Sequence, residues 1–182
     1  MIQALHTIRE GGVILYPTDT IWGLGCDASN ADAIAKIQRI KQRDPHKNML
    51  VLALPEFTTI LNPTALNLLQ NSIRPTTVIV PIHQIQFHNS TLGNYHESTL
   101  GIRFPKHPFC QSLLHSLGCP IISTSANLSG EPSPAHFEEI SDKIKLSVDY
   151  CVPNLPEYQS NVTQASRILK IEPSGEINVI RD

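Results

Sequence analysis

Short apolar runs and amphipathic stretches alternate along the chain. Val13–Tyr16 is a run of four residues, three of them aliphatic and one aromatic, and such a run is typical of a buried strand. Ala31–Lys41 instead places its alanines and isoleucines at helical spacing behind Asn30, a favourable N-cap residue. This stretch therefore predicts an amphipathic helix that turns one face toward the core.

The same pattern predicts the remaining elements. We expect helices at Ala4–Glu10, Ala65–Gln70, Phe109–Leu117 and His136–Lys143, and strands at Met49–Ala53, Thr77–Val80, Thr99–Phe104, Pro120–Ser123, Ser147–Val152, Arg167–Ile171 and Ile177–Ile180. Residues 17–25 are predicted to form a polar, glycine-containing loop, and residues 83–98 an irregular one. Helices and strands alternate early and strands cluster late, so we expect an α/β fold with a mixed sheet. Its 182 residues suit a single domain, 1–182.

Composition narrows the function classes. Hydrophobic residues make up 41% of the chain, charged residues 16%, and the formal net charge is −2, whereas dedicated nucleic-acid binders usually carry a basic excess. The four cysteines form no C-x-x-C pair and the eight histidines no H-E-x-x-H motif, so we expect no permanent metal site. The sequence contains no apolar stretch long enough for a membrane span, and we expect a cytoplasmic protein without a signal peptide.

Three segments gather polar residues after apolar elements: Pro17–Thr20, Lys41–Lys47 and Ser123–Ser133. In open α/β sheets, ligands bind beyond the ends of strands. The Lys and Arg side chains of the second segment can clamp a polyphosphate, and the hydroxyls of the third can cradle an anion. Simpler structural explanations are a tight turn, a solvated helix end and a Ser/Thr-rich turn.

Arg103 is a cation among apolar neighbours in Gly101–Pro105. A buried arginine requires an anionic partner. The alternative is an edge-strand arginine in contact with water. The sequence leaves both open.

Taken together and in order, four motifs resemble the YrdC-domain family of threonylcarbamoyl-AMP synthases. They are Pro17–Gly25 (PTDTIWGLG), Lys41–Arg43 with the following Lys47, Gly101–Pro105 (GIRFP) and Ser123–Gly130 (STSANLSG). The resemblance implies a twisted mixed α/β sheet flanked by helices, with a large concave basic cavity. It implies a nucleotidyltransferase that forms threonylcarbamoyl-AMP and pyrophosphate from L-threonine, bicarbonate and ATP.

The resemblance also implies roles for individual residues. Threonine would be bound by Thr20, Arg103, Ser123 and Ser166; ATP by Arg43, Lys47, Thr99, Ser125, Ser133 and Arg181; and Lys41 and Arg43 would serve the chemistry. Mg²⁺ would arrive with ATP rather than occupy a protein site. The product would pass to a tRNA-modifying threonylcarbamoyltransferase complex acting on adenosine 37, and weak direct tRNA binding is left open.

The sequence departs from the family pattern at several positions. Ile73-Arg74-Pro75 stands where Pro-Gly-Pro is usual, Asp44 separates Arg43 from Pro45, and Arg167 follows Ser166 where threonine is common. Three alternatives therefore stay open. They are a non-catalytic RNA-binding module, a different carbamoyl-adenylate enzyme, and a diverged paralogue acting on another amine.

Overall fold

The computed structural model describes residues 1–47, 49–88, 92, 98–158, 162 and 164–182. The helices are α1 (Ile2–Arg9), α2 (Ala31–Lys41), α3 (Pro63–Asn71), α4 (Pro108–Leu117) and α5 (Asp142–Ser147). The strands are β1 (Ile14–Tyr16), β2 (Gly23–Asp27), β3 (Leu50–Leu52), β4 (Thr58–Leu61), β5 (Thr76–Pro81), β6 (Ile85–Phe87), β7 (Thr99–Arg103), β8 (Ile121–Ser125), β9 (Tyr150–Cys151), β10 (Arg167–Ile171) and β11 (Ile177–Arg181). The predicted α/β class is confirmed.

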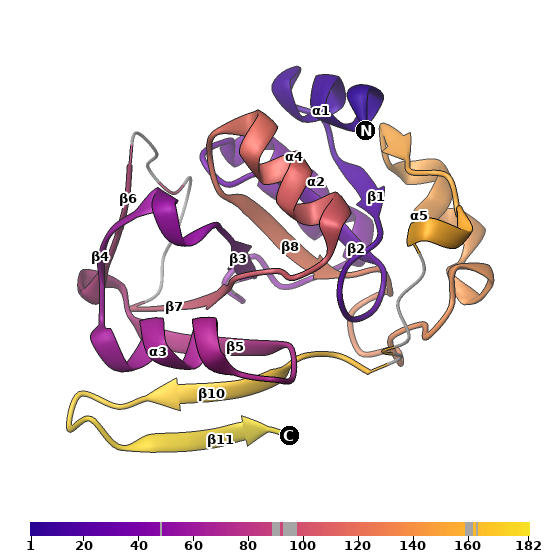
Figure 1. The fold of residues 1–182 in the computed structure, drawn as a ribbon. Coiled ribbons are helices and arrows are strands. Elements are labelled where there is room, and N and C mark those ends of the chain that lie inside the picture. The colour runs from indigo at the N-terminus through magenta and orange to yellow at the C-terminus, as the bar shows by residue number, and fades with distance from the viewer. Residues whose placement is uncertain (48, 89–91, 93–97, 159–161, 163) are drawn as a thin grey trace.

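Over the described residues, nine strands form one sheet in the order β11-β10-β5-β7-β3-β8-β2-β1-β9, and β4 and β6 pair separately. The large sheet is mixed, as expected. Strand β10 runs parallel to β5 and β3 parallel to β7, whereas β5 and β7 are antiparallel. Strands β7, β3 and β8 therefore form the centre of the sheet, and the late strands β10 and β11 lie at one edge (Figure 1).

Side-chain alternation separates the two faces of the sheet. Successive residues of a strand point to opposite faces. The residues at even positions, Leu100 and Ile102 of β7 and Val78 and Val80 of β5, are fully buried. These four side chains belong to the hydrophobic core. The odd positions of the same two strands are consequently left to line the opposite face.

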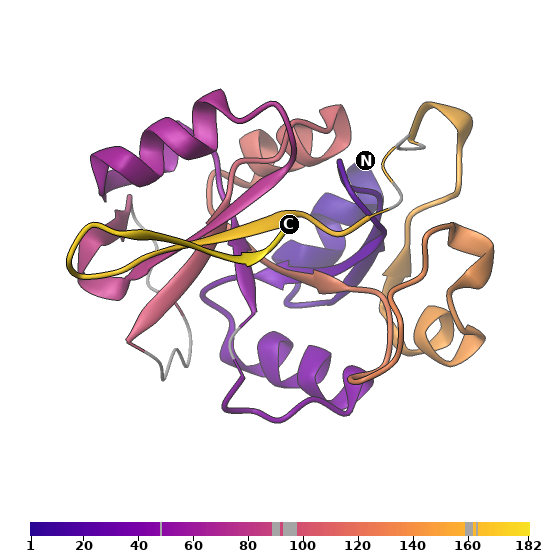
Figure 2. The ribbon, with the colours of Figure 1, turned by 90° about the horizontal axis from the view of Figure 1, so that it is seen from below.

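Helices cover both faces of the sheet. Figure 2 shows α3 and α4 on one side of it and α2 on the other. Helix α4 buries Phe109, Leu113 and Leu114, while α2 buries Ala33, Ile34 and Ile37. The Asn30 side chain accepts a hydrogen bond from the Ala33 N–H, as the predicted N-cap requires. None of the described helices is long and apolar enough to cross a membrane.

The prediction of a loop over residues 17–25 was partly wrong. Its second half opens strand β2, which pairs antiparallel with β1 and with β8. Glycines weaken strand propensity, and they concealed this strand in the sequence. Gly25 is needed there because a Cβ would lie 2.7 Å from Cε1 of Tyr16. The close approach lets the Tyr16 ring pass against β2.

Two other expectations need correction. Strands β4 and β6 were not predicted, and β6 lies within the stretch 83–98 that was expected to be irregular. Residues 89–91 and 93–97 of that stretch lie outside the described residues. The helix expected at His136–Lys143 is a 3₁₀ turn at Phe137–Glu139 followed by α5. The Glu139 carboxylate accepts from the backbone N–H groups of Ala135 and His136, which closes a tight turn and delays the helix.

Candidate functional site

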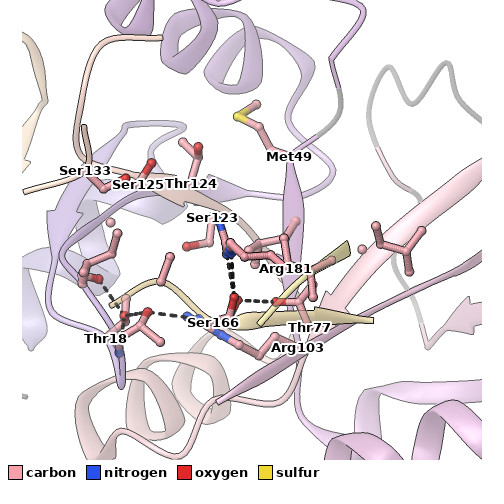
Figure 3. A pocket seen from close by; sticks show the side chains of 18 of the residues that line it. Thr18, Met49, Thr77, Arg103, Ser123, Thr124, Ser125, Ser133, Ser166 and Arg181 are labelled. Atoms are coloured by element: carbon pink, nitrogen blue, oxygen red, sulfur yellow. Dashed lines mark hydrogen bonds between the residues drawn. The ribbon is translucent and has the colours of Figure 1, made fainter. Parts of the chain in front are cut away.

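A cavity of about 470 Å³ opens on the face of the sheet defined by the odd positions of β5 and β7. This volume is in the range of small-molecule sites. Its walls combine the loop between β1 and β2, the turn after α2, and strands β3, β5, β7, β8, β10 and β11 (Figure 3). Segments that are far apart in the sequence therefore share one hollow.

Nearly all of the residues proposed from sequence meet in this cavity. Those that line it are Thr20, Arg43, Lys47, Thr99, Arg103, Ser123, Ser125, Ser133, Ser166 and Arg181. Their side chains come from four loops and three strands, and only the fold brings them together. The structure thus groups the residues named for threonine with those named for ATP.

The charged residues that line the cavity are of one sign. Arg43, Lys47, Arg103 and Arg181 are lining residues, and no carboxylate is found among the described lining residues. Burial lowers the pKa of Arg181, and the nearby Arg103 charge lowers it further. An anionic ligand would relieve this repulsion between cations, so the site is suited to anions.

Arg103 is the most constrained of these cations. It is 3% exposed and lies on β7, between β5 and β3, which excludes the edge-strand alternative. Its Nη1 donates to Thr20 Oγ1 at 3.1 Å, and its Nη2 lies 3.4 Å from Asp19 Oδ1. Its Nε has no hydrogen-bond partner among the described residues. Asp19 is thus the anionic partner that burial demands.

A chain of hydroxyls continues from Arg103 into the loop between β1 and β2. Thr18 Oγ1 donates to the Ile21 carbonyl at 2.7 Å and lies 2.9 Å from Thr20 Oγ1. It also accepts the Thr20 N–H at 3.1 Å. These bonds fix the loop of the PTDT motif around the arginine, which explains why threonines rather than apolar residues occupy it.

The C-terminal strands close the cavity from another side. Arg181 on β11 donates through Nε and Nη2 to the Ser166 carbonyl, at 2.9 and 2.7 Å. The Ser166 hydroxyl lies 2.8 Å from Thr77 Oγ1 on β5 (Figure 3). The last two residues implied by the family resemblance, Ser166 and Arg181, are therefore bound to each other and to the central sheet.

Arg43 and Lys47 belong to the turn that follows α2. Gln42 ends the helix in a left-handed conformation with φ of 50°, and this conformation redirects the chain. Arg43 Nε then donates to the Lys47 carbonyl at 3.1 Å, and the Asp44 carboxylate accepts the His46 N–H at 2.9 Å. The turn holds both cations at the cavity.

Lys41, which was expected beside the triphosphate, does not line the cavity. It is 2% exposed, and its ammonium donates to the carbonyls of Ser125 and Asn127 and to Asn127 Oδ1. Burial lowers its pKa to about 8, and Arg43 contributes. Its position favours a role in holding the Ser123–Gly130 loop rather than contact with substrate. Lys41 is the last residue of α2, whereas Arg43 follows the left-handed Gln42 that redirects the chain toward the cavity.

The sequence analysis did not single out Tyr16, Thr18 or Thr77 for the site. Thr18 stands in the quoted motif, but its role depends on which neighbour its hydroxyl bonds. Thr77 could have been found from strand alternation, since it shares its face with Thr99 and Arg103. Tyr16 is wholly buried and donates to Ser123 Oγ at 2.6 Å, and no sequence pattern reveals such a contact between distant residues.

The donor set does not suit a resident metal ion. Magnesium prefers carboxylate and other oxygen ligands in octahedral geometry. The described cavity lining provides hydroxyls and cations instead, and the described residues contain no group of three His, Cys, Asp or Glu side chains that could hold a metal. A magnesium ion would therefore have to be bound chiefly by a ligand's own phosphates.

Comparisons with known proteins agree with one another. A family model covering Sua5, YciO and YrdC, described as telomere recombination, matches residues 6–182. The threonylcarbamoyl-AMP synthase of Stenotrophomonas maltophilia is 34% identical over 155 residues, which is 81% of this chain and 82% of that protein. Escherichia coli YciO superposes with a TM-score of 0.74 at 26% identity, covering 99% of this chain and 87% of its own.

A further structural neighbour is P. abyssi Sua5 in complex with L-threonine. It superposes with a TM-score of 0.77 at 21% identity over 92% of this chain. The match covers 49% of the Sua5 chain, so the present sequence spans about half of that protein. At this identity the likeness concerns the fold.

The position of Lys41 generates a prediction. Lys41→Met keeps the length of the side chain but leaves two buried carbonyls without their donor, which costs about 1–3 kcal/mol for each unsatisfied group. We expect the free energy of unfolding in urea to fall by about 2 kcal/mol or more, and ATP binding to weaken because Ser125 is in the loosened loop.

Lys36→Met is the matched control on the same helix. Lys36 pairs with Asp149 at 2.5 Å, but the two side chains are 33% and 40% exposed, so its loss should cost less than about 1 kcal/mol. Equal stability of the two variants, with unchanged ATP affinity, would contradict the role given to Lys41.

Proposed function

The chain belongs to the Sua5/YciO/YrdC family, and on that premise we propose that it is a threonylcarbamoyl-AMP synthase. Such an enzyme converts L-threonine, bicarbonate and ATP to threonylcarbamoyl-AMP and pyrophosphate. Curated relatives that carry this name are 30–39% identical over 71–89% of the chain.

A single cavity with two separate cationic regions carries the proposal. Arg103 is the last residue of β7, whereas Lys47 precedes β3, which runs parallel to β7. The two ends of a five-residue strand are about 13 Å apart. One region can therefore hold the carboxylate of threonine near Arg103 and Ser123, while the other holds phosphates near Arg43 and Lys47. Both substrates would face the same hollow.

The chemistry needs this arrangement. The threonine amine attacks bicarbonate and loses water to give a carbamate, and a carbamate oxygen then attacks the α-phosphorus as pyrophosphate leaves. Two anions must approach each other, so donors and cations that neutralise charge lower the barrier. Positioning and electrostatics dominate such transfers. The cationic lining and its hydroxyls suit this task, and the reaction needs no side-chain nucleophile.

Magnesium would enter this cavity with ATP. When bound to the triphosphate it neutralises charge on the phosphate oxygens. The chain's own contribution is to hold the phosphates with Arg43 and Lys47 and to orient them against the amino acid. The hydroxyls of Thr99, Ser125 and Ser133 would contact the nucleotide.

The product sets the expected partners. Threonylcarbamoyl-AMP is an activated acyl phosphate anhydride and must be passed to an acceptor, which we propose is a threonylcarbamoyltransferase complex acting on tRNA. ATP and tRNA are both cytoplasmic, so we place the enzyme in the cytoplasm. We also propose that the chain itself binds tRNA weakly.

The proposed function is tested by pyrophosphate release. Purified protein is incubated with ATP and Mg²⁺, and release is measured with and without L-threonine and bicarbonate. We expect release that requires both. Release driven equally well by another amine would identify a diverged paralogue, and tight ATP binding without any amine-dependent release would contradict the synthase function.

Two substitutions should separate the two cationic regions. Arg43→Ala removes a charge-assisted phosphate contact and is expected to lower kcat/KM for ATP by roughly thirty-fold, or about 2 kcal/mol. Arg103→Lys keeps the charge but loses the forked donor geometry. It should raise the KM for threonine at least ten-fold and change the KM for ATP little.

Arg39→Ala provides the control for both variants. Arg39 is an exposed cation on α2 that does not line the cavity, and its loss should leave both KM values unchanged. If Arg103→Lys affected ATP more strongly than threonine, the assignment of the two regions would be reversed.

A further inference from the structure

Ser123 and Tyr16 form a buried pair at the wall of the cavity. Ser123 lies on β8, is 4% exposed and is one of the lining residues. Tyr16 lies at the end of β1 and donates its O–H to Ser123 Oγ at 2.6 Å. Strand β2 separates β1 from β8 in the sheet. The Tyr16 side chain therefore extends across β2 to contact Ser123.

The Tyr16 hydroxyl is restricted to this one bond. Its ring is fixed between Gly25, where a Cβ would come within 2.7 Å, and Phe109, whose ring centroid lies 6.4 Å away. Complete burial raises the pKa of Tyr16 well above its ordinary value, so the phenol keeps its proton. Within the described chain it has no other hydrogen-bond partner, and it acts as a donor.

The direction of this bond decides what Ser123 can do. A serine hydroxyl has one proton to donate. Its oxygen already accepts from Tyr16, and the described residues offer no acceptor for its own proton. A buried donor without a partner is costly, and here it borders a cavity. We propose that Tyr16 is a positioning residue that makes the Ser123 hydroxyl donate into the cavity, where it recognises the carboxylate of the amino-acid substrate.

Thr20 has the opposite polarity. The proton of Thr18 is committed to the Ile21 carbonyl, so Thr18 Oγ1 accepts the proton of Thr20. Thr20 Oγ1 in turn accepts from Arg103 Nη1, and it retains only acceptor capacity. The site therefore presents donors at Ser123 and Arg103 and an acceptor at Thr20. An L-amino acid fits this polarity with its carboxylate at the donors and its hydroxyl or amine at Thr20.

This inference rests on the proposed function and predicts a specific selectivity. L-Threoninamide replaces the carboxylate with a neutral amide whose NH₂ group would face the donor side, so the wild type should bind it more weakly than L-threonine. Trp22 is the only tryptophan of the chain and lines the cavity. Its fluorescence can report the binding of both ligands in the presence of ATP and Mg²⁺.

Tyr16→Phe tests the role of the phenol, because it keeps the ring and removes only the O–H. Without its donor, the Ser123 hydroxyl is free to turn and accept from an amide. We expect the preference for L-threonine over L-threoninamide to fall about three- to ten-fold, with the KM for ATP unchanged. Ser123→Ala should reduce the preference at least as much, and the double variant should match Ser123→Ala alone.

Tyr150→Phe is the matched control, since Tyr150 lies on the edge strand β9 and does not line the cavity. It should leave the preference unchanged. If Ser123→Ala lowers the preference but Tyr16→Phe does not, or if Tyr16→Phe changes only the melting temperature, the positioning role is overturned while the proposed function stands. A wild type that shows no response to L-threonine, in binding or in pyrophosphate release, would overturn both.

Discussion

A single buried cation, Arg103, sets the conditions for the rest of the site. A guanidinium that is 3% exposed in the middle of a sheet is tolerated only when an anion and hydrogen-bond acceptors surround it. Asp19 and Thr20 supply these from the loop between β1 and β2. That loop must therefore pack against β7, and the hydroxyl chain through Thr18 then fixes its shape. The arginine still keeps its Nε donor without a partner within the described chain.

The sheet turns this local requirement into a cavity. Even positions of β5 and β7 pack into the core, and their odd positions face the hollow. Gly101 lies among those odd positions, and the absence of a side chain keeps the floor open. Helix α2 ends at one border of the cavity and places Arg43 there, while Lys41 is turned inward to hold the neighbouring loop. Two cationic regions result, one buried at Arg103 and one at the more exposed turn of Arg43 and Lys47.

Much of this could be predicted from the sequence, and the reasons for the rest are physical. Apolar periodicity located α2 and α4, and the run before Pro17 located β1, because burial dictates those patterns. The family resemblance named ten residues that line the cavity, and also Lys41, which does not line it. Strand β2 was not predicted because Gly23 and Gly25 have low strand propensity. Glycine is present at these positions because the neighbouring strands approach closely. The position of Lys41 and the bond from Tyr16 to Ser123 depend on contacts between distant segments, which single-sequence patterns do not contain.

The central claim is that one cavity binds the amino acid and the nucleotide in separate, oriented places. A crystal structure with L-threonine and a non-hydrolysable ATP analogue tests it most directly. The account predicts the threonine carboxylate at hydrogen-bond distance, about 3 Å, from Ser123 Oγ and the Arg103 guanidinium, with the phosphates against Arg43 and Lys47. Threonine bound outside this cavity, or phosphates bound to Arg103, would contradict it.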